Sequence, residues 1–297
     1  MTIAACYIST EGVVLGADST STVFVAGSGG QLGSEHYYDF GQKVFELGDE
    51  GSTTGVVIWG LGSLGHTSYR TLLAEVADAA NPQTIASLAD LSVLAASMFW
   101  KEYAGAYQPL LDEANQLAAK GKARSADEQR KMLFLQQNLS GGFCLGGRWG
   151  TSRRPGAYEI LFDPLMQTAP APKPLSPGNW FWGCPNLIDR LIFSMDRDLF
   201  TRVIQSGKWT GTPDELFGLV AQGALGQPRD LPLREAIDWI YASVYTTIKA
   251  MKFSHLVPVC GGPIEVAVIS TDRPFRWVRH KSLGEAVAAH RTKEDRP

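Results

Sequence analysis

The sequence has few cysteines, and none of them are closely spaced. Its 297 residues include only four, at Cys6, Cys144, Cys184 and Cys260, and no two form a C-x-x-C pair. This spacing excludes a zinc ribbon and a disulfide-built scaffold, and it fits a reducing compartment. We therefore expect a protein that folds around a hydrophobic core and is located in the cytoplasm.

Long hydrophobic runs are also missing. No stretch approaches the roughly 18 continuous apolar residues that indicate a membrane-spanning helix. The first residues, MTIAACYISTEGVV, lack the basic segment that opens a secretory signal. Both observations predict a protein without a membrane partner.

Neither sign of charge dominates. Lys and Arg total 27 and Asp and Glu total 30, which gives a net charge of −3. The charged runs RSADEQRK and HRTKEDRP mix both signs, so no basic face for a polyanion is indicated. Nucleic acid is therefore not an expected partner.

Strand-like and helix-like segments come in blocks rather than in alternation. Strands are predicted at TIAACYI, GVVLGAD, STVFVA, KVFEL, TGVVIW, GGFCLGG, YEILFD, NWFWG, IEVAVIST and FRWVRH. A first helix is predicted from about Gly65 to a stop at Asn81-Pro82, and a long helical region then runs to about Gln137 with a break at LAAKGKARSADE. Further helices are predicted over 187–207, 213–224 and 233–251. A Gly-rich loop is expected at GSGGQLGSEHYYDFG. This order favours antiparallel sheets with helices packed outside them, an α+β class.

A literal G-x-G-x-x-G motif runs from Gly60 to Gly65, after a strand and before a helix. A dinucleotide site needs a second strand that ends in an acid about 20 residues further on. Here that window, from Asp78 to Pro82, is the end of one helix followed by another. We interpret the motif as a tight strand-to-helix turn, with dinucleotide binding as the less favoured alternative.

A possible nucleophile stands at the second position, Thr2. Removal of Met1 would leave a hydroxyl and a free α-amine on one residue, and such an amine titrates at roughly 7.7–8.0. An adjacent amine of this kind can activate a Thr hydroxyl as a nucleophile. The alternative is that Thr2 has no catalytic role, because many proteins begin with Met-Thr.

The context of Thr2 favours the nucleophile. The segment TIAACYISTEGVVLGADSTST resembles the start of the proteasome β-subunits, in the N-terminal nucleophile (Ntn) hydrolase superfamily. On this basis the chain is identified as a divergent bacterial-type proteasome homologue. The resemblance implies a four-layer αββα sandwich of two antiparallel sheets. It also implies that Asp18 and Lys43 (in QKVFEL) support the nucleophile.

The same resemblance assigns further site residues. Gly60 takes the place whose backbone N–H forms the oxyanion hole, a role that suits a rigid backbone donor. Two serine positions of the family carry Cys184 and Cys260, and its aspartate position carries Val257. Cys260 is expected either to contribute a weak S–H donor or to be a small buried residue. His255, five residues before it, leaves a Cys–His dyad as a minor alternative.

The implied function is acyl transfer: an N-terminal threonine peptidase or amidohydrolase that cleaves amide bonds through a Thr2 acyl-enzyme. The implied substrate is a peptide or unfolded protein. The implied working form is a homo-oligomer built as a ring or stacked rings, with an unfoldase as a further candidate partner. No cofactor and no metal are implied. The competing hypothesis is a catalytically silent, proteasome-like scaffold subunit, which Val257 and Cys184 favour.

The length fits one domain over 1–297, because strands before and after the helical block are expected in the same sandwich. The chain is longer than a typical β-type subunit. We assign the excess to insertions near 27–41, 80–137 and 204–230.

Overall fold

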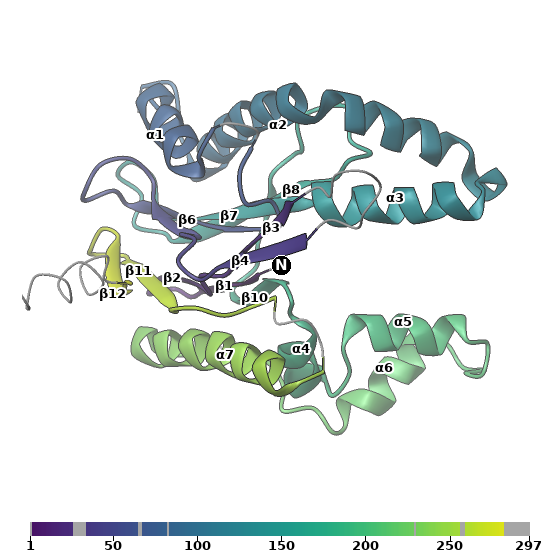
Figure 1. Ribbon diagram of the computed structural model, residues 1–297. Coiled ribbons are helices and arrows are strands. Elements are labelled where there is room, and N and C mark those ends of the chain that lie inside the picture. The colour runs from purple at the N-terminus through teal and green to yellow at the C-terminus, as the bar shows by residue number, and fades with distance from the viewer. Residues whose placement is uncertain are drawn as a thin grey trace, which may run out of the picture.

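Two antiparallel five-stranded sheets lie face to face between layers of helices in the computed structural model of the chain (Figure 1). The structure describes residues 2–25, 34–64, 67–81, 83–228, 230–255 and 259–281. The first sheet has the order β10 (Gly178–Gly183), β1 (Ile3–Ile8), β2 (Gly12–Ala17), β11 (Glu265–Ser270) and β12 (Arg276–Arg279). The second has the order β5 (Val44–Glu46), β6 (Thr54–Trp59), β7 (Gly141–Gly147), β8 (Gly156–Phe162) and β9 (Lys173–Pro174).

Helices cover both outer faces of the sheet pair. Above the second sheet in Figure 1 lie α1 (Tyr69–Ala79) and α2 (Leu88–Ala119). After a 3-10 turn at Gly121–Ala123, α3 (Ala126–Leu139) runs back below the far part of α2, beside the sheet. Below the first sheet lie α4 (Asn186–Phe193) and α7 (Leu233–Phe253). Helices α5 (Arg197–Gln205) and α6 (Pro213–Ala221) extend beyond α4. This arrangement confirms the expected four-layer α+β sandwich of the Ntn-hydrolase type.

Three hydrophobic clusters fill the three spaces between layers. One joins the second sheet to α1, α2 and α3, one lies between the sheets, and one joins the first sheet to α7. Between the sheets, the rings of Trp59 and Trp182 stack with centroids 4.5 Å apart. Every residue of β1 and β2 is buried, because both faces of that sheet are covered. This explains why their sequences are continuously apolar rather than alternating.

Two local predictions were wrong. The single helix predicted over 187–207 is two helices, because Ser194 takes the left-handed conformation (φ 65°) and Asp196 then caps a new helix. The segment expected to be a Gly-rich loop contains strand β4 (Ser34–Tyr38), which pairs with β3 (Ser21–Val25). Its preceding part, 26–33, lies outside the described residues.

The segments predicted as insertions have defined structures where they are described. Helices α2 and α3 form an antiparallel hairpin that makes up most of 80–137, and α6 lies within 204–230. The single-domain organisation of 1–297 stays a prediction. In the described part of the chain, no helix is both long enough and apolar enough to span a membrane.

Candidate active site

Thr2 lies immediately before β1, at the end of the strand next to β10. It is buried, with 3% of its surface exposed. Its carbonyl oxygen accepts a hydrogen bond from the Cys184 N–H at 2.8 Å. The turn that makes this bond requires glycine at Gly183, which has φ +82° and where a Cβ would lie 1.8 Å from the Thr2 oxygen. The end of β10 therefore fixes the Thr2 backbone.

Asp18 follows β2 and is fully buried. Its Oδ1 accepts the N–H of Ile3 at 3.1 Å, so the carboxylate is bound to the residue next to Thr2. Its Oδ2 accepts the N–H of Thr20 at 3.2 Å and that of Gly261 at 3.0 Å. A buried carboxylate needs such donors to offset the loss of water. Asp18 thus ties the start of β1, the end of β2 and the turn before β11 together.

Lys43 completes the group. It precedes β5, and its Nζ lies 2.7 Å from Asp18 Oδ1, the same oxygen that binds Ile3 N–H. Both partners are buried, with side-chain exposures of 7% and 0%. The fold therefore brings Thr2, Asp18 and Lys43 together, as expected from the sequence. Their catalytic roles stay predictions.

Gly60 follows β6, which pairs with β5, the strand that Lys43 precedes. Ile58 N–H, two residues earlier, donates to Lys43 O at 2.9 Å. Gly60 has φ +83°, and a Cβ there would lie 2.5 Å from both Gly141 Cα and Ser140 O. Among the described residues, no hydrogen bond joins Gly60 to Thr2, Asp18 or Lys43. Its role as an oxyanion donor stays a prediction.

Cys260 is next to a residue that binds Asp18, Gly261. Gly261 N–H donates to Asp18, and Gly261 O accepts the N–H of Ser19 at 2.9 Å. The Cys260 side chain is buried, in the same hydrophobic cluster as Cys184. Val257 lies outside the described residues. His255 is exposed, whereas Cys260 is buried, which does not favour a Cys–His dyad.

A second buried charged group behind Lys43 was missed from the sequence. Glu265 is fully buried at the start of β11. Its Oε2 accepts a hydrogen bond from the Lys43 backbone N–H at 3.5 Å. The same oxygen lies 3.4 Å from Lys281 Nζ, and Oε1 lies 2.9 Å from His280 Nδ1. Lys281 also donates to Gly41 O at 2.9 Å. A charge at the head of the apolar run IEVAVIS was a usable signal for Glu265, whereas nothing in the sequence marked Lys281.

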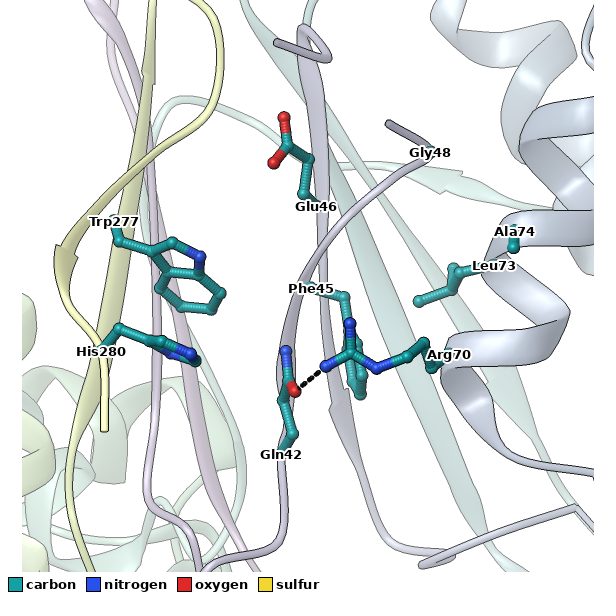
Figure 2. A pocket seen from close by; sticks show the side chains of 9 residues that line it. All are labelled: Gln42, Phe45, Glu46, Gly48, Arg70, Leu73, Ala74, Trp277 and His280. Carbon is teal, nitrogen blue, oxygen red and sulfur yellow. Dashed lines mark hydrogen bonds between the residues drawn. The ribbon is translucent and has the colours of Figure 1, made fainter. Parts of the chain in front are cut away.

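A cavity of about 210 Å³ lies on the outer side of edge strand β5. Figure 2 shows Trp277 of β12 and His280, the residue after β12, on one side of the cavity. Phe45 and Arg70 lie on the other side. The Arg70 guanidinium is bonded to the Gln42 side chain. Because His280 also faces Glu265, this cavity is connected through buried charges to the Lys43 backbone.

The described residues offer no cluster of three His, Cys, Asp or Glu side chains that could hold a metal ion. The glycine motif does not open a dinucleotide-binding unit either. Helix α1 is followed by α2, not by a parallel strand, and both five-stranded sheets are antiparallel. Gly65, the last glycine of the motif, lies outside the described residues.

Comparisons with known proteins add solved structures only. No family model and no curated protein matches the chain. Among solved structures, the helical assembly of the Anbu complex from Pseudomonas aeruginosa is 15% identical, with a TM-score of 0.48, and the match covers 98% of this chain and 91% of that chain. The Anbu Gly-1 mutant from Hyphomicrobium sp. strain MC1 is 12% identical, with a TM-score of 0.47 and coverages of 100% and 99%. Anbu (ancestral β-subunit) from Yersinia bercovieri is 11% identical, with a TM-score of 0.44 and coverages of 99% and 97%.

These comparisons correct the identification made from the sequence. The chain was identified as a divergent bacterial-type proteasome homologue, and that identification was wrong, because the similar solved structures are Anbu proteins and no proteasome family model matches. The motifs that carried the identification are short. The case for function therefore rests on the geometry of the Thr2 site.

Proposed function

We propose that the chain is an N-terminal threonine hydrolase that cleaves amide bonds through an acyl-enzyme on Thr2. The observation that carries this proposal is the buried ion pair of Lys43 and Asp18, whose shared oxygen also binds the amide that follows Thr2. A buried ion pair is costly to desolvate and is no general source of stability. Its location beside a hydroxyl residue at the start of β1 supports a chemical role.

The proposed reaction begins after Met1 is removed, which frees the Thr2 amine. The amine takes the proton from Thr2 Oγ, directly or through a water molecule, while Oγ attacks the amide carbonyl. The Lys43 cation disfavours a second positive charge nearby and so keeps the amine in its basic form. Asp18 holds Lys43 in place. An adjacent backbone N–H, assigned to Gly60, would stabilise the oxyanion.

Collapse of the tetrahedral intermediate expels the amine product and leaves an ester on Thr2. Water then releases the acid, or a second amine intercepts the ester and gives transpeptidation. Cys260 is assigned a supporting role, because the next residue, Gly261, donates its N–H to Asp18 at 3.0 Å. All of this chemistry uses side-chain and backbone groups of this chain.

A peptide or an unfolded segment is the proposed substrate, and the cytoplasm is the proposed location, which four reduced cysteines support. A homo-oligomer is proposed as the working form. Large apolar side chains support it, because Phe217, Leu219 and Leu225 near α6 are 51%, 56% and 80% exposed. An unfoldase partner stays a prediction.

The experiment that tests the proposal combines intact mass with turnover. We expect the purified protein to lack Met1 and to hydrolyse members of a fluorogenic peptide library. Thr2→Ala should abolish this hydrolysis, whereas Thr2→Ser, which keeps a hydroxyl, should retain part of it. Retention of Met1, or equal hydrolysis by Thr2→Ala, would refute the proposal.

A catalytically silent scaffold is the second candidate. It is favoured by Cys184 and Cys260, two buried cysteines at the turns around Thr2 and Asp18, because a thiol is a weaker hydrogen-bonding group than a hydroxyl. A scaffold predicts normal assembly by size-exclusion chromatography with no turnover on any peptide.

A further inference from the structure

Lys281, which follows His280 after β12, has its amino group in the interior of the protein. Its side chain is 4% exposed. The Nζ atom lies 3.4 Å from Glu265 Oε2, donates to Gly41 O at 2.9 Å and donates to Ser19 Oγ at 3.4 Å. A lysine ammonium carries three N–H donors, and these three acceptors match them. The surroundings therefore fit the charged form of Lys281.

Two of these acceptors belong to the segments that carry the Asp18–Lys43 ion pair. Ser19 directly follows Asp18, and Gly41 stands two residues before Lys43. The two segments are also bonded to each other, because Gly41 N–H donates to Ser19 O at 2.8 Å. Lys281 thus lies where the Asp18 turn of the first sheet meets the segment that leads into β5 of the second sheet.

Glu265 binds the same segment at its other end. Its Oε2 accepts the Lys43 backbone N–H at 3.5 Å. The carbonyl of Gly41 is therefore bound by Lys281, and the amide of Lys43 is bound by the carboxylate with which Lys281 pairs. The Lys43 side chain reaches Asp18 from a backbone that Glu265 and Lys281 hold in place.

The two buried ion pairs also act on each other through their charges. Burial has the largest effect on the pKa of Lys281 and lowers it below its usual value, whereas Glu265 raises it. The Lys43 cation lowers this pKa further, and the Asp18 carboxylate raises it. Because interactions between charges are reciprocal, the Lys281 cation also disfavours additional positive charge around Lys43.

We propose that Lys281 and Glu265 are positioning residues for the Thr2 reaction. Both act through Lys43 and Asp18. They hold the Lys43 backbone against the Asp18 turn, and the Lys281 cation helps to keep the Thr2 amine in its basic form. Their role in turnover rests on the proposed hydrolase function.

His280 is a titratable neighbour of this group that solvent reaches. Its side chain is 36% exposed, it lines the cavity of Figure 2, and its Nδ1 lies 2.9 Å from Glu265 Oε1. The cavity also contains the charged side chains of Arg70 and Glu46. Histidines and α-amines change charge in neighbouring pH ranges. A pH measurement therefore has to separate His280 from the Thr2 amine.

The test is the pH dependence of kcat/KM for a fluorogenic peptide, measured on the full-length protein that has lost Met1. The acidic limb of this profile reports the free Thr2 amine. Lys281→Met removes a cation, so the limb should move to higher pH by about half a unit or more. Glu265→Gln removes an anion but keeps an amide oxygen for the Lys43 N–H, so the limb should move to lower pH. Loosening of the structure alone would not give opposite signs.

Further variants separate charge from stability. Lys281→Arg keeps the cation and should return the limb toward its position in the unmodified protein. Arg190→Met, on α4, is the matched control, because it also removes a cation from a fully buried carboxylate, that of Asp196. It should lower stability without moving the limb. Combined with His280→Gln, the Lys281 and Glu265 variants should keep their opposite shifts.

A second measurement does not need turnover. Threonine with an isotope-labelled methyl group gives a Thr2 NMR signal that titrates with the α-amine. Thr2→Ser identifies this signal by removing it. The midpoint of the amine titration should rise in Lys281→Met and fall in Glu265→Gln.

The positioning role and the hydrolase fail separately. Opposite shifts of the amine midpoint in a protein without turnover support the link between Lys281 and the Thr2 amine and reject the proposed hydrolase. Turnover with a limb that Lys281→Met leaves in place, or with shifts of the same sign in Lys281→Met and Glu265→Gln, overturns the positioning role and keeps the hydrolase. Opposite shifts that vanish in the His280→Gln background also overturn it.

Discussion

Lys43 Nζ lies 2.7 Å from Asp18 Oδ1 in an ion pair from which water is almost entirely excluded, although 25 positions separate the two residues. The pair connects the two sheets, because Asp18 follows β2 of the first sheet and Lys43 precedes β5 of the second. The sandwich therefore has to be folded before this pair exists, and Thr2 is held beside it by Ile3.

Replacement of Lys43 by Met should reduce turnover by about 10²–10⁴-fold, the range expected when a group that supports proton transfer is lost. It also leaves Asp18 as a buried charge, so the free energy of unfolding should fall by about 3–5 kcal/mol. Steady-state kinetics and urea unfolding measure both effects. Lys131→Met is the matched control, because the Lys131–Glu113 pair lies on the surface, with side-chain exposures of 53% and 34%. Removal of that pair should cost at most about 1 kcal/mol. Equal effects of the two variants would contradict a special role for Lys43.

Replacement of Gly60 by Ala should destabilise the turn after β6. The residue has φ +83°, and the new Cβ would lie 2.5 Å from Gly141 Cα, so both strain and a clash are introduced. Gly51→Ala has the same backbone strain at φ +92° but open space around the Cβ. We expect Gly60→Ala to lower the free energy of unfolding more than Gly51→Ala does, by about 1–3 kcal/mol of overpacking. Thermal unfolding should show this as a lower midpoint for Gly60→Ala. Equal midpoints would show that the turn opens freely.

The Glu265–Lys281 pair should act as a structural link behind Lys43. Lys281→Met leaves the fully buried Glu265 without its ammonium partner, and we expect a loss of about 3–5 kcal/mol in unfolding free energy. A double variant, Glu265→Leu with Lys281→Met, removes both charges and should recover part of that loss. This interpretation would be contradicted if the double variant lost more unfolding free energy than the losses of the two single variants added together.

Acid stability should depend on Asp196 at the start of α5. Burial pushes the pKa of Asp196 upward, but the Leu199 N–H at 2.8 Å and the Arg190 guanidinium outweigh this effect, so its pKa lies below the usual value. A carboxyl with a lowered pKa in the folded state stabilises the fold above about pH 3.9, and that stabilisation is lost as the pH falls through the lowered pKa.

Asp196→Asn keeps a capping side chain and removes the charge. We expect a loss of about 1–2 kcal/mol at neutral pH and a smaller difference from the unmodified protein at pH 2. Urea unfolding at both pH values measures it. A difference that is constant with pH would show that the cap, and not the charge, is responsible.

The layers of the fold could be predicted from the sequence because their signals are local. The buried runs of β1 and β2 and the helical stripes of α1, α2 and α7 report directly on which faces are covered. The break at Ser194 could not be predicted, because it depends on a single left-handed residue inside an otherwise helical pattern. Strand β4 was missed because glycines and polar residues surround it.

The site was predictable only in part, for a similar reason. Thr2 and Asp18 stand at the same end of the β1–β2 hairpin, so their meeting follows from that pairing. Lys43 precedes a strand of the other sheet, and only the family resemblance placed it with them. Glu265 and Lys281 are joined through tertiary contacts between β11 and the segment after β12, for which local patterns give no signal. The hydrogen bond of Gly261 N–H to Asp18 likewise joins two turns that are 243 positions apart in the sequence.

The most direct test of the central claim is covalent labelling of Thr2. The protein is incubated with a threonine-directed β-lactone, and the adduct is located by peptide mass spectrometry, with Thr2→Ala and Lys43→Met in parallel. The account predicts one ester adduct on Thr2 of a chain that has lost Met1, much slower labelling of Lys43→Met, and none of Thr2→Ala. An adduct on another residue, or labelling of Thr2→Ala at the unmodified rate, would contradict it.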